Sequence, residues 1–451
     1  MAVGTTAVDG VVSGIKTTEL INSILKASAV QKTLAEARIT TYEDKVSKIT
    51  ELRDLLGDLE ESLQAMETTS KFLSYSAAYD EDNGAFTVET DGNAVPGSFD
   101  VNVNQIAKSD MFLSQGFASK TATGVLSTGT LAVTIDGSTT NITLDGSSTL
   151  TTLVQDLNDI DGVTAYVMNT GDASNPYKLV VTGTKTGADH GITLDTSGLS
   201  GGTTPTFSQV TTAQDAEFTV NGEAITSSTN EATGVIQGVT FNLKDVSTSA
   251  ETVTIAADST AIEAKITSFV DSYNAVLDFI KTNQDFDSEN NIKDAFVGES
   301  SVRQVAQGIL SKATSQFTSL GQDYDSAVLV GIESDGKGRL TFDSTVFKAA
   351  FAAEADQVTN FFAGSDAFSQ GLLEKIDVYN DSVSGTLVLR KDSLESRIED
   401  LDEQVARYDK RLTVMEARLR NQFNAMESIL GGLQGSQTYI TALLAQSTSS
   451  K

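Results

Sequence analysis

The chain has 451 residues, which is enough for two to four domains with sizeable cores. Its 61 acidic and 31 basic residues give a formal net charge of −30, which argues against binding to nucleic acid or to an anionic membrane surface. Cysteine is absent and histidine occurs once, which excludes disulfides, thiol chemistry and zinc sites built on a histidine pair.

The N-terminal part of the chain is predicted to be helical. Residues 1–14 are small and polar and are expected to be disordered until bound. A helix is expected to begin at Thr17 or Thr18, and its apolar face carries Leu20, Ile21, Ile24 and Leu25. A longer run then repeats apolar residues in steps of four and three, as a coiled-coil seam does: Ala35, Ile39, Tyr42, Val46, Ile49, Leu52, Leu56, Leu59, Leu63 and Met66.

From residue 70 to about 258 the composition favours β-structure. Alternating patterns predict strands at 86–88, 99–103, 131–135, 141–144, 163–169, 178–182, 190–194, 215–221, 237–243 and 251–256. One short helix is expected at 149–160, and 198–206 is expected to be a loop. We therefore predict a β-rich head domain formed by 70–115 and 207–258, with an α+β module at 116–206 inserted into it.

The C-terminal part returns to helical patterns. Helices are expected to start at Asp258 or Ser259 and at Ser300 or Ser301, and a hairpin is expected from 328–332 and 340–342. An Ala- and Phe-rich helix follows and ends near Phe361-Phe362.

The longest pattern in the chain is a second heptad seam between Leu387 and Leu433. Its steps of four and three include one eleven-residue stretch, from Leu412 to Phe423, which locally unwinds a left-handed supercoil. The seam residues are Leu394, Ile398, Leu401, Val405, Tyr408, Leu412, Met415, Leu419, Phe423, Met426, Leu430 and Leu433. A break is expected at Gly431-Gly432, before a last short helix with Tyr439, Ile440, Leu443 and Leu444.

The two seams predict an α+β multidomain protein in which both chain ends form a long antiparallel helical coiled-coil leg. The leg would consist of 31–69 and 259–431, with 1–30 and 432–451 as terminal helical segments and the nested β-rich head domains between them. The alternative, that each seam packs against its own neighbouring domain, remains open.

Three patterns imitate chemical sites. Residues 331–337 match most of a phosphate-binding loop, but Gly338 stands where Ser or Thr is required and a strand follows instead of a helix. Asp285, Asp287, Glu289 and Asn291 alternate as in a calcium loop, but the glycine at the sixth position and the glutamate at the twelfth are missing. His190 lies in a predicted strand edge. We predict no catalytic residue, no metal site and no cofactor.

Four further stretches carry a family signature. The first is Ser13-Gly14-Ile15-Lys16-Thr17-Thr18-Glu19-Leu20-Ile21, and the most specific is 214–222 with Ile225, Ser227, Ser228, Asn230 and 235–243. The others are the module at 125–196 and the set Gly331-Ile332, 336–343, Phe361-Phe362 and Tyr439-Ile440. Together they resemble the bacterial flagellar filament cap proteins, a hook-associated family. Lys16 departs from the pattern, because the family usually has Asp there.

The resemblance implies an extracellular protein at the distal tip of the flagellum, secreted through the flagellar type III export channel. It implies a ring-like homo-oligomer, with a pentamer as the expected size, beneath which flagellin subunits fold and insert. The implied partners are flagellin, the hook–filament junction protein and a cytoplasmic export chaperone, with host glycans as a further candidate. The terminal helices, with Leu20, Ile21, Ile24, Leu25, Tyr439, Ile440, Leu443 and Leu444, are expected to dock reversibly in the filament.

Two other readings remain open at this point. One is a flagellin or a hook–filament junction protein, which would also carry terminal helices. The other is an adhesin that binds host glycans through its Ser/Thr-rich head domains. An enzyme is disfavoured because no coherent site is visible in the sequence.

Overall fold

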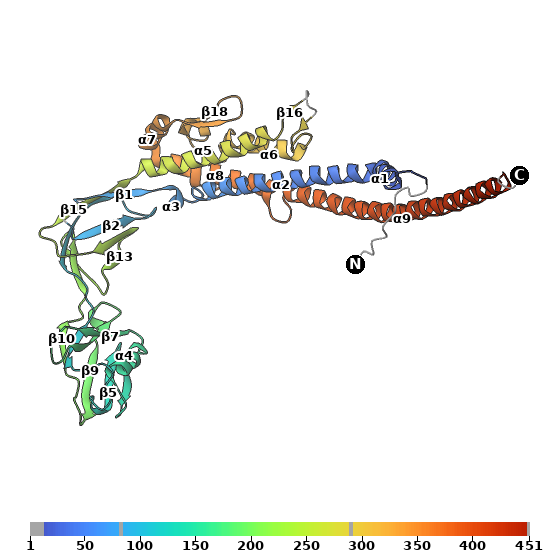
Figure 1. Ribbon diagram of the computed structural model, residues 1–451. Helices are drawn as coiled ribbons and strands as arrows, with labels where there is room; N and C mark the ends of the chain where they lie inside the picture. The colour runs from blue at the N-terminus through green and yellow to red at the C-terminus, as the bar shows by residue number, and fades with distance from the viewer. Residues whose placement is uncertain (1–12, 81–83, 288–291, 449–451) are drawn as a thin grey trace. The chain divides into compact units, whose positions relative to one another are not determined.

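The computed structural model describes residues 13–80, 84–287 and 292–448 (Figure 1). The chain forms two compact units, which are described separately. We call them the helical unit, Met1–Ala65 with Ile266–Lys451, and the sheet unit, Met66–Lys265. Residues 1–12 of the expected disordered segment, and Glu289 and Asn291 of the calcium-like loop, lie outside the described residues.

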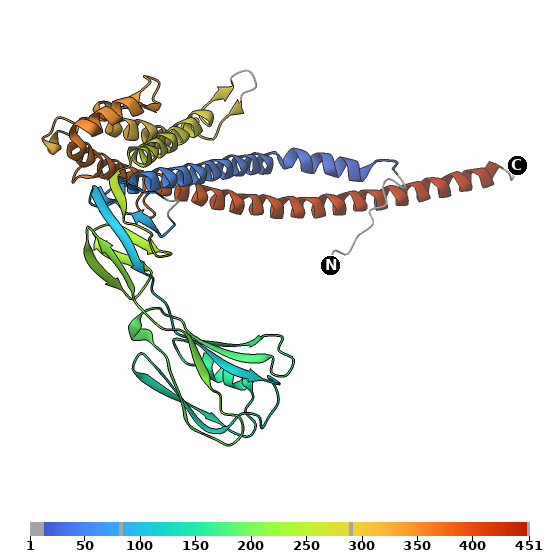
Figure 2. The same ribbon diagram turned by 90° about the vertical axis from the view of Figure 1, so that its left-hand side faces the viewer.

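Both chain ends enter the helical unit and lie side by side. Helices α1 (Thr17–Ser28) and α2 (Val30–Gln64) run antiparallel to α9 (Thr386–Thr448) (Figures 1 and 2). Lys32 Nζ lies 2.6 Å from Asp409 Oδ1, and the Ser13 amide donates to Glu427 Oε2 at 3.3 Å, so the numbering of the two partners runs in opposite directions. The predicted antiparallel leg is therefore confirmed, and we use "leg" for α1, α2 and α9.

Burial in the leg follows the two seams. Ile49, Leu56, Leu59, Leu63 and Leu394 are buried. The remaining predicted leg residues are half-buried: Ile39, Tyr42, Val46, Ile398, Leu401, Val405, Leu412, Met415 and Leu419. The difference arises because α8 (Phe368–Asn380) also packs on α2 and α9 near the first set, whereas farther along only paired helices cover the seam.

The predicted break at Gly431-Gly432 is wrong, because α9 continues through both glycines to Thr448. A glycine in a helix costs about 1 kcal/mol relative to alanine, which weakens the helix without ending it. Neither glycine adopts the left-handed conformation that usually terminates a helix. The terminal segment is thus a continuation of the leg and not a separate helix.

The rest of the helical unit is a small bundle built around a cluster of phenylalanine rings. Its further elements are α5 (Ser259–Thr282, which begins in the sheet unit), β16 (Phe286–Asp287), β17 (Ile292–Lys293), α6 (Ser300–Ala313), the 3-10 turns η3 (Thr318–Leu320) and η4 (Ala327–Val330), β18 (Ile332–Ser334), β19 (Leu340–Phe342) and α7 (Ser344–Ala363). Phe368 is fully buried, and its ring lies 5.2 to 5.9 Å from those of Phe269, Phe317, Phe361 and Phe362.

Two details of this bundle differ from the expectations. The segment at Ala327–Val330 is a 3-10 turn and not part of a strand, since the hairpin pairs only Ile332–Ser334 with Leu340–Phe342. Helix α8 was not foreseen, and α7 ends before it at Ala363. The cap of α5 is as expected, because Asp258 Oδ1 accepts a hydrogen bond from the Ala261 amide at 3.0 Å.

A buried glutamate ties the leg to the bundle. Glu299 precedes α6, and only 6% of its side chain is exposed. It accepts hydrogen bonds from Lys45 Nζ of α2 at 2.7 Å, and from Arg390 Nε and Nη2 of α9 at 2.8 and 2.9 Å. Burial alone would raise the pKa of Glu299, but the hydrogen bonds from Arg390 and Lys45 outweigh it, so the pKa lies below its ordinary value. One carboxylate therefore joins three helices.

The sheet unit contains two cores. The first lies between a five-stranded sheet, ordered β1-β15-β3-β11-β12, and a three-stranded sheet, ordered β13-β14-β2, in which all paired strands are antiparallel. The bounds are α3 (Thr69–Phe72), β1 (Tyr75–Ala78), β2 (Phe86–Thr90), β3 (Gly97–Gln105), β11 (Ala216–Val220), β12 (Glu223–Ser227), β13 (Glu231–Ile236), β14 (Val239–Leu243) and β15 (Glu251–Ala257). Phe86, Phe218 and Phe241 pack at its centre.

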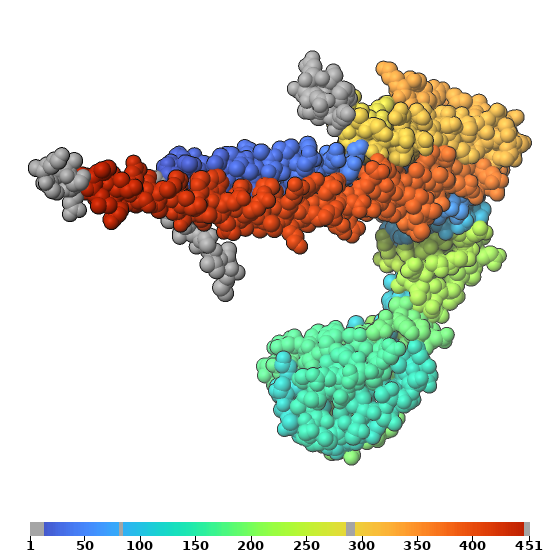
Figure 3. All heavy atoms as spheres, turned by 90° about the vertical axis from the view of Figure 1, so that its right-hand side faces the viewer, coloured from blue at the N-terminus to red at the C-terminus, as the bar shows by residue number. Residues whose placement is uncertain are grey.

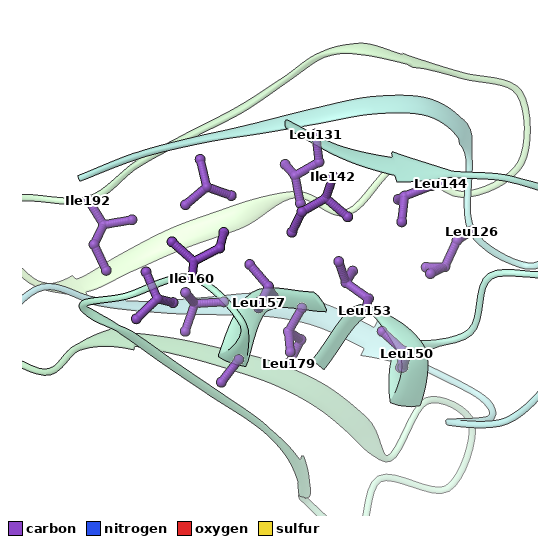
Figure 4. Packing of buried hydrophobic residues seen from close by; sticks show 14 of the residues in the cluster. Leu126, Leu131, Ile142, Leu144, Leu150, Leu153, Leu157, Ile160, Leu179 and Ile192 are labelled. Carbon is purple, nitrogen blue, oxygen red and sulfur yellow. The ribbon is translucent and has the colours of Figure 1, made fainter. Parts of the chain in front are cut away.

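The second core belongs to the segment inserted between β3 and β11. Its sheets are ordered β10-β4-β8-β7 and β6-β5-β9, and α4 lies between them. The bounds are β4 (Met111–Phe117), β5 (Thr128–Ile135), β6 (Ser138–Leu144), α4 (Leu150–Asn158), β7 (Val163–Asn169), β8 (Tyr177–Gly183), η2 (Ala188–His190), β9 (Thr193–Ser200) and β10 (Phe207–Thr211). Figure 4 shows Leu150, Leu153 and Leu157 of α4 facing Leu131 and Ile142.

The insertion extends beyond the predicted 116–206. Strands β4 and β10 pair with each other, and β4 also pairs with β8, so 111–115 and 207–211 belong to the inserted sheet. The strand predicted at 190–194 corresponds to β9, which begins at Thr193 and not at His190, and it runs through Gly198 to Ser200 where a loop was expected. The short helix is placed correctly, and Thr149 caps it by accepting from the Thr152 amide at 3.1 Å.

The phenylalanine cluster predicts the effect of one core substitution. Changing Phe368 to Ala should lower the free energy of unfolding of the helical unit by about 3 to 5 kcal/mol, because a fully buried ring leaves a cavity. Urea unfolding followed by circular dichroism at 222 nm measures the change. Val383→Ala is the control, since Val383 is 78% exposed and should shift the curve by less than about 0.5 kcal/mol. Equal shifts for the two variants would contradict the packing described here.

The Glu299 contact predicts a pH dependence. Glu299→Gln should destabilise the helical unit at pH 7 by about 2 kcal/mol, less than for a fully buried pair because 30% of the Arg390 side chain is exposed. A carboxyl whose pKa is lower in the folded state stabilises that state at neutral pH, and the contribution disappears as the pH falls through the folded-state pKa. The difference between wild type and variant, measured by urea unfolding, should therefore shrink below about pH 4. A difference that stays constant down to pH 2 would show that the charge of Glu299 is not responsible.

Candidate functional site

The predicted contact residues of α1 divide into two groups. Ile21 is only 2% exposed, and Ile24 and Leu25 are half-buried, because α1 packs on α9 of the same chain. Leu20 is 43% exposed. In the free chain, the apolar face of α1 is therefore largely occupied, and only Leu20 of this set points to solvent.

The predicted contact residues of α9 are all exposed. Tyr439 is 69% exposed, Ile440 57%, Leu443 49% and Leu444 62%, and Leu433 before them is 61% exposed. Figure 3 shows α9 extending past the end of α1, so α1 and α2 do not cover this part. Leu433 and Ile440 are seven residues apart and Leu443 is three further on, so these residues continue the seam spacing of the leg. The end of α9 thus presents an apolar stripe suited to a second helical surface.

Polar contacts fix the register of the leg between its two ends. Lys32 occupies a seam position of α2, where it contacts Asp409 at 2.6 Å and Glu36 at 3.4 Å. The hydrogen bond to Asp409 raises the pKa of Lys32 despite some desolvation. A charged residue within an apolar seam disfavours other alignments of the two helices, because a shifted register would remove the contact with Asp409 and leave only the partner in the same helix. The sequence analysis missed this contact, although the Lys at a seam position was a visible signal.

The remaining candidate sites do not assemble into chemical centres. His190 Nδ1 lies 2.5 Å from Asp136 Oδ1, and this contact lowers the pKa of Asp136, as does Lys185 at 3.6 Å. The pair joins the β5–β6 turn to η2 at the surface, which is a structural arrangement. Residues 331–337 form β18 and the turn of the β18–β19 hairpin, so the segment continues into a strand and not into a helix as a phosphate-binding loop does.

The described residues form neither a metal-binding group nor a membrane-spanning helix. Within 13–80, 84–287 and 292–448, His, Cys, Asp and Glu side chains form no group of three that could hold a metal ion. In the same ranges, no helix has both the length and the apolar character that crossing a bilayer requires.

Comparison with known proteins places the chain in one family. The model for the N-terminus of flagellar hook-associated protein 2 matches residues 13–110, and the model for its C-terminus matches 213–435. The B-type flagellar hook-associated protein 2 of Pseudomonas aeruginosa is 25% identical over 462 residues, covering 95% of each chain. Flagellar hook-associated protein 2 of Escherichia coli O157:H7 is 25% identical over 470 residues, covering 98% of each chain.

A solved structure supports the fold. The crystal structure of the D1-D2-D3 domains of the flagellar cap protein FliD from Escherichia coli covers 77% of this chain and 99% of its own, with a TM-score of 0.63 and 23% identity. The two family models together match more than two thirds of the sequence and cover both seams. The chain therefore belongs to the flagellar hook-associated protein 2 family, the structural proteins that cap the flagellar filament at its extracellular, distal tip.

Proposed function

We infer that this chain caps the flagellar filament by inserting the end of α9 into the filament tip. The observation that carries the proposal is the exposed apolar stripe of Leu433, Tyr439, Ile440 and Leu443. Apolar side chains at helical spacing are the usual way in which one helix docks in a groove formed by others. The helix that presents them has 63 residues and is about 95 Å long at 1.5 Å per residue, so the stripe lies far along the leg from the bundle.

The two ends of the leg suit different tasks. Near Glu299 the leg is tied to the bundle by buried side chains and ion pairs, so this part is rigid. Beyond Leu430 the stripe is exposed and α9 contains Gly431, Gly432 and Gly435, which lower helix stability by about 1 kcal/mol each. A docking segment of modest intrinsic stability binds reversibly, because ordering it offsets part of the binding free energy. Reversible docking is what a cap needs if it steps as each subunit is added.

The family is a self-assembling one, and we propose a ring-like homo-oligomer, with five copies as the working number. Flagellin and the hook–filament junction protein are the proposed partners of the stripe. A cytoplasmic chaperone that covers the same stripe before export is proposed because exposed apolar helices aggregate. We propose a purely structural role without catalysis. We do not extend the proposal to glycan binding, because no described residue of the sheet unit singles it out.

Removing the stripe should abolish capping. In cells that lack their own cap protein, the chain without Gln434–Lys451 should fail to restore filaments, and flagellin should accumulate in the medium. The double substitution Ile440→Asp and Leu443→Asp should have the same effect, because burying two carboxylates in an apolar groove is unfavourable. Electron microscopy of the cells and a flagellin immunoblot of the medium measure both outcomes.

A matched control separates the stripe from a general effect of charge. Thr438→Asp with Thr441→Asp adds the same charge at exposed polar positions of the same helix turns, away from the stripe, and should leave filaments normal. Normal filaments from the truncated chain would refute the proposal.

A further inference from the structure

The charges of the leg are sorted by side. With seam residues at heptad positions a and d, the positions that flank the seam are e and g. In α2, position e holds Glu36 and Glu43, and position g holds Arg38 and Lys45. In α9 the same sorting extends over four heptads. Position e holds Glu395, Asp402, Asp409 and Glu416, and position g holds Arg390, Arg397, Arg411 and Arg418, with Gln404 between.

Antiparallel pairing places like positions on the same side of the leg. The structure demonstrates this directly, since Lys45 and Arg390, both at position g, reach the same carboxylate of Glu299. The leg therefore has one basic side and one acidic side. We call them the basic flank (Arg38, Lys45, Arg390, Arg397, Arg411 and Arg418) and the acidic flank (Glu36, Glu43, Glu395, Asp402, Asp409 and Glu416).

The basic flank contains a repeat of the Glu299 site without its glutamate. Arg38 lies seven residues before Lys45, and Arg397 lies seven residues after Arg390, so the second cationic pair sits one heptad, about 10 Å, farther along the leg. The side chains of Arg38 and Arg397 are exposed, and neither forms an ion pair with any residue in the described ranges. A carboxylate placed between Arg38 and Arg397 would have two cationic neighbours, as Glu299 has in Lys45 and Arg390.

The flank continues in a hollow farther along. Ser28, Gln31, Tyr408, Arg411, Leu412 and Met415 line a hollow of about 210 Å³ where α1 meets α2. Gln31 and Arg411 both occupy position g, so the hollow opens on the basic flank. Arg411 and Arg418 are exposed and, like Arg38, have no ion-pair partner within the described part of the chain. The flank thus offers both unpaired charge and room for side chains from a neighbour.

The acidic flank supplies matching groups. Glu43 and Asp402 are exposed and form no ion pair among the residues described. Asp402 lies only five residues, about 7.5 Å, from Arg397 along the same helix. Because α2 and α9 are antiparallel, Glu43 lies about 7.5 Å from the Arg38–Arg397 level in the opposite direction. A parallel neighbour shifted by about 7.5 Å would therefore bring its Asp402 level with Arg38 and Arg397, and its Glu43 toward Lys45.

We propose that neighbouring copies in the cap are joined leg to leg, with the acidic flank of one copy against the basic flank of the next and Asp402 at the level of the Arg38–Arg397 pair. This inference rests on the proposed function, because it assumes that copies assemble in a ring. A contact between two different surfaces of the same chain closes into a ring when each copy is rotated relative to the last. Charges of opposite sign on the two flanks also oppose a head-on contact between identical flanks.

Charge reversal of each flank tests the proposal in the full-length chain. Arg38→Glu with Arg397→Glu places acidic residues at the proposed contact level of the basic flank, and Glu43→Lys with Asp402→Lys places basic residues at that of the acidic flank. Each double variant should weaken self-association by at least about tenfold in low salt, because like charges then face each other. All four substitutions in one chain exchange the signs at these contact positions and should restore the oligomer. Sedimentation velocity across a concentration series gives the masses.

Two controls make the result interpretable. Arg407→Glu with Lys410→Glu changes the net charge by the same amount on the face opposite the seam, and it should leave the mass unchanged. Arg38→Gln with Arg397→Gln removes the charges without reversal and should weaken association in part, which provides a second readout if a reversed variant loses helix content by circular dichroism.

Three outcomes would overturn the proposal. Wild-type mass in both reversed variants would show that the flanks do not join the copies. Loss of association without restoration in the fourfold variant would show that the partner of the basic flank is not a second leg. Unchanged mass combined with lost motility would assign the flank to a filament protein. By contrast, a wild-type oligomer that forms but never restores filaments would contradict the proposed function and leave the leg contact standing.

Discussion

The antiparallel seam between α2 and α9 is the interaction on which the rest of the helical unit depends. It joins residues that are more than 300 positions apart, and Ile49, Leu56, Leu59 and Leu394 are buried within it. Because the seam brings both chain ends together, the bundle and the sheet unit have to be formed by the chain between them. The nested order of segments in the sequence follows from this one pairing, since every inner segment must leave and re-enter through the segment outside it.

Periodicity predicted the leg well because the residues of a heptad seam are the ones that pack against the partner helix. The prediction was wrong at Gly431-Gly432, where the two glycines suggested a break but no Pro or left-handed residue ends the helix. It also failed at the edges of the insertion. Residues 111–115 and 207–211 belong to the inserted sheet because β4 and β10 pair across almost a hundred residues, and no local pattern records such a contact.

Contacts between charged residues were the least predictable part. Glu299 lies in a loop segment, and nothing near it in the sequence indicates that Lys45 and Arg390 converge on it. Spacing alone cannot choose a partner for a carboxylate in a chain with 61 acidic residues. Once the antiparallel pairing is known, however, the heptad position of each charged residue indicates on which side of the leg it lies. The convergence of Lys45 and Arg390 on Glu299 confirms this assignment for position g. The same assignment places Arg38 and Arg397 side by side one heptad farther along.

The sorted flanks are better explained by assembly than by stability of the leg itself. An antiparallel pair is stabilised when each side mixes the two signs, because e faces e and g faces g, and like charges at these positions repel. This leg has the less favourable arrangement on both sides. Glu299 relieves the repulsion on the basic flank between Lys45 and Arg390, and Lys32 relieves it on the acidic flank through Glu36 and Asp409. A second leg beside each flank would relieve the remainder along its whole length. Like charges that repel each other within one copy attract the opposite charges of the next copy. The arrangement that weakens the isolated leg therefore favours the assembled ring.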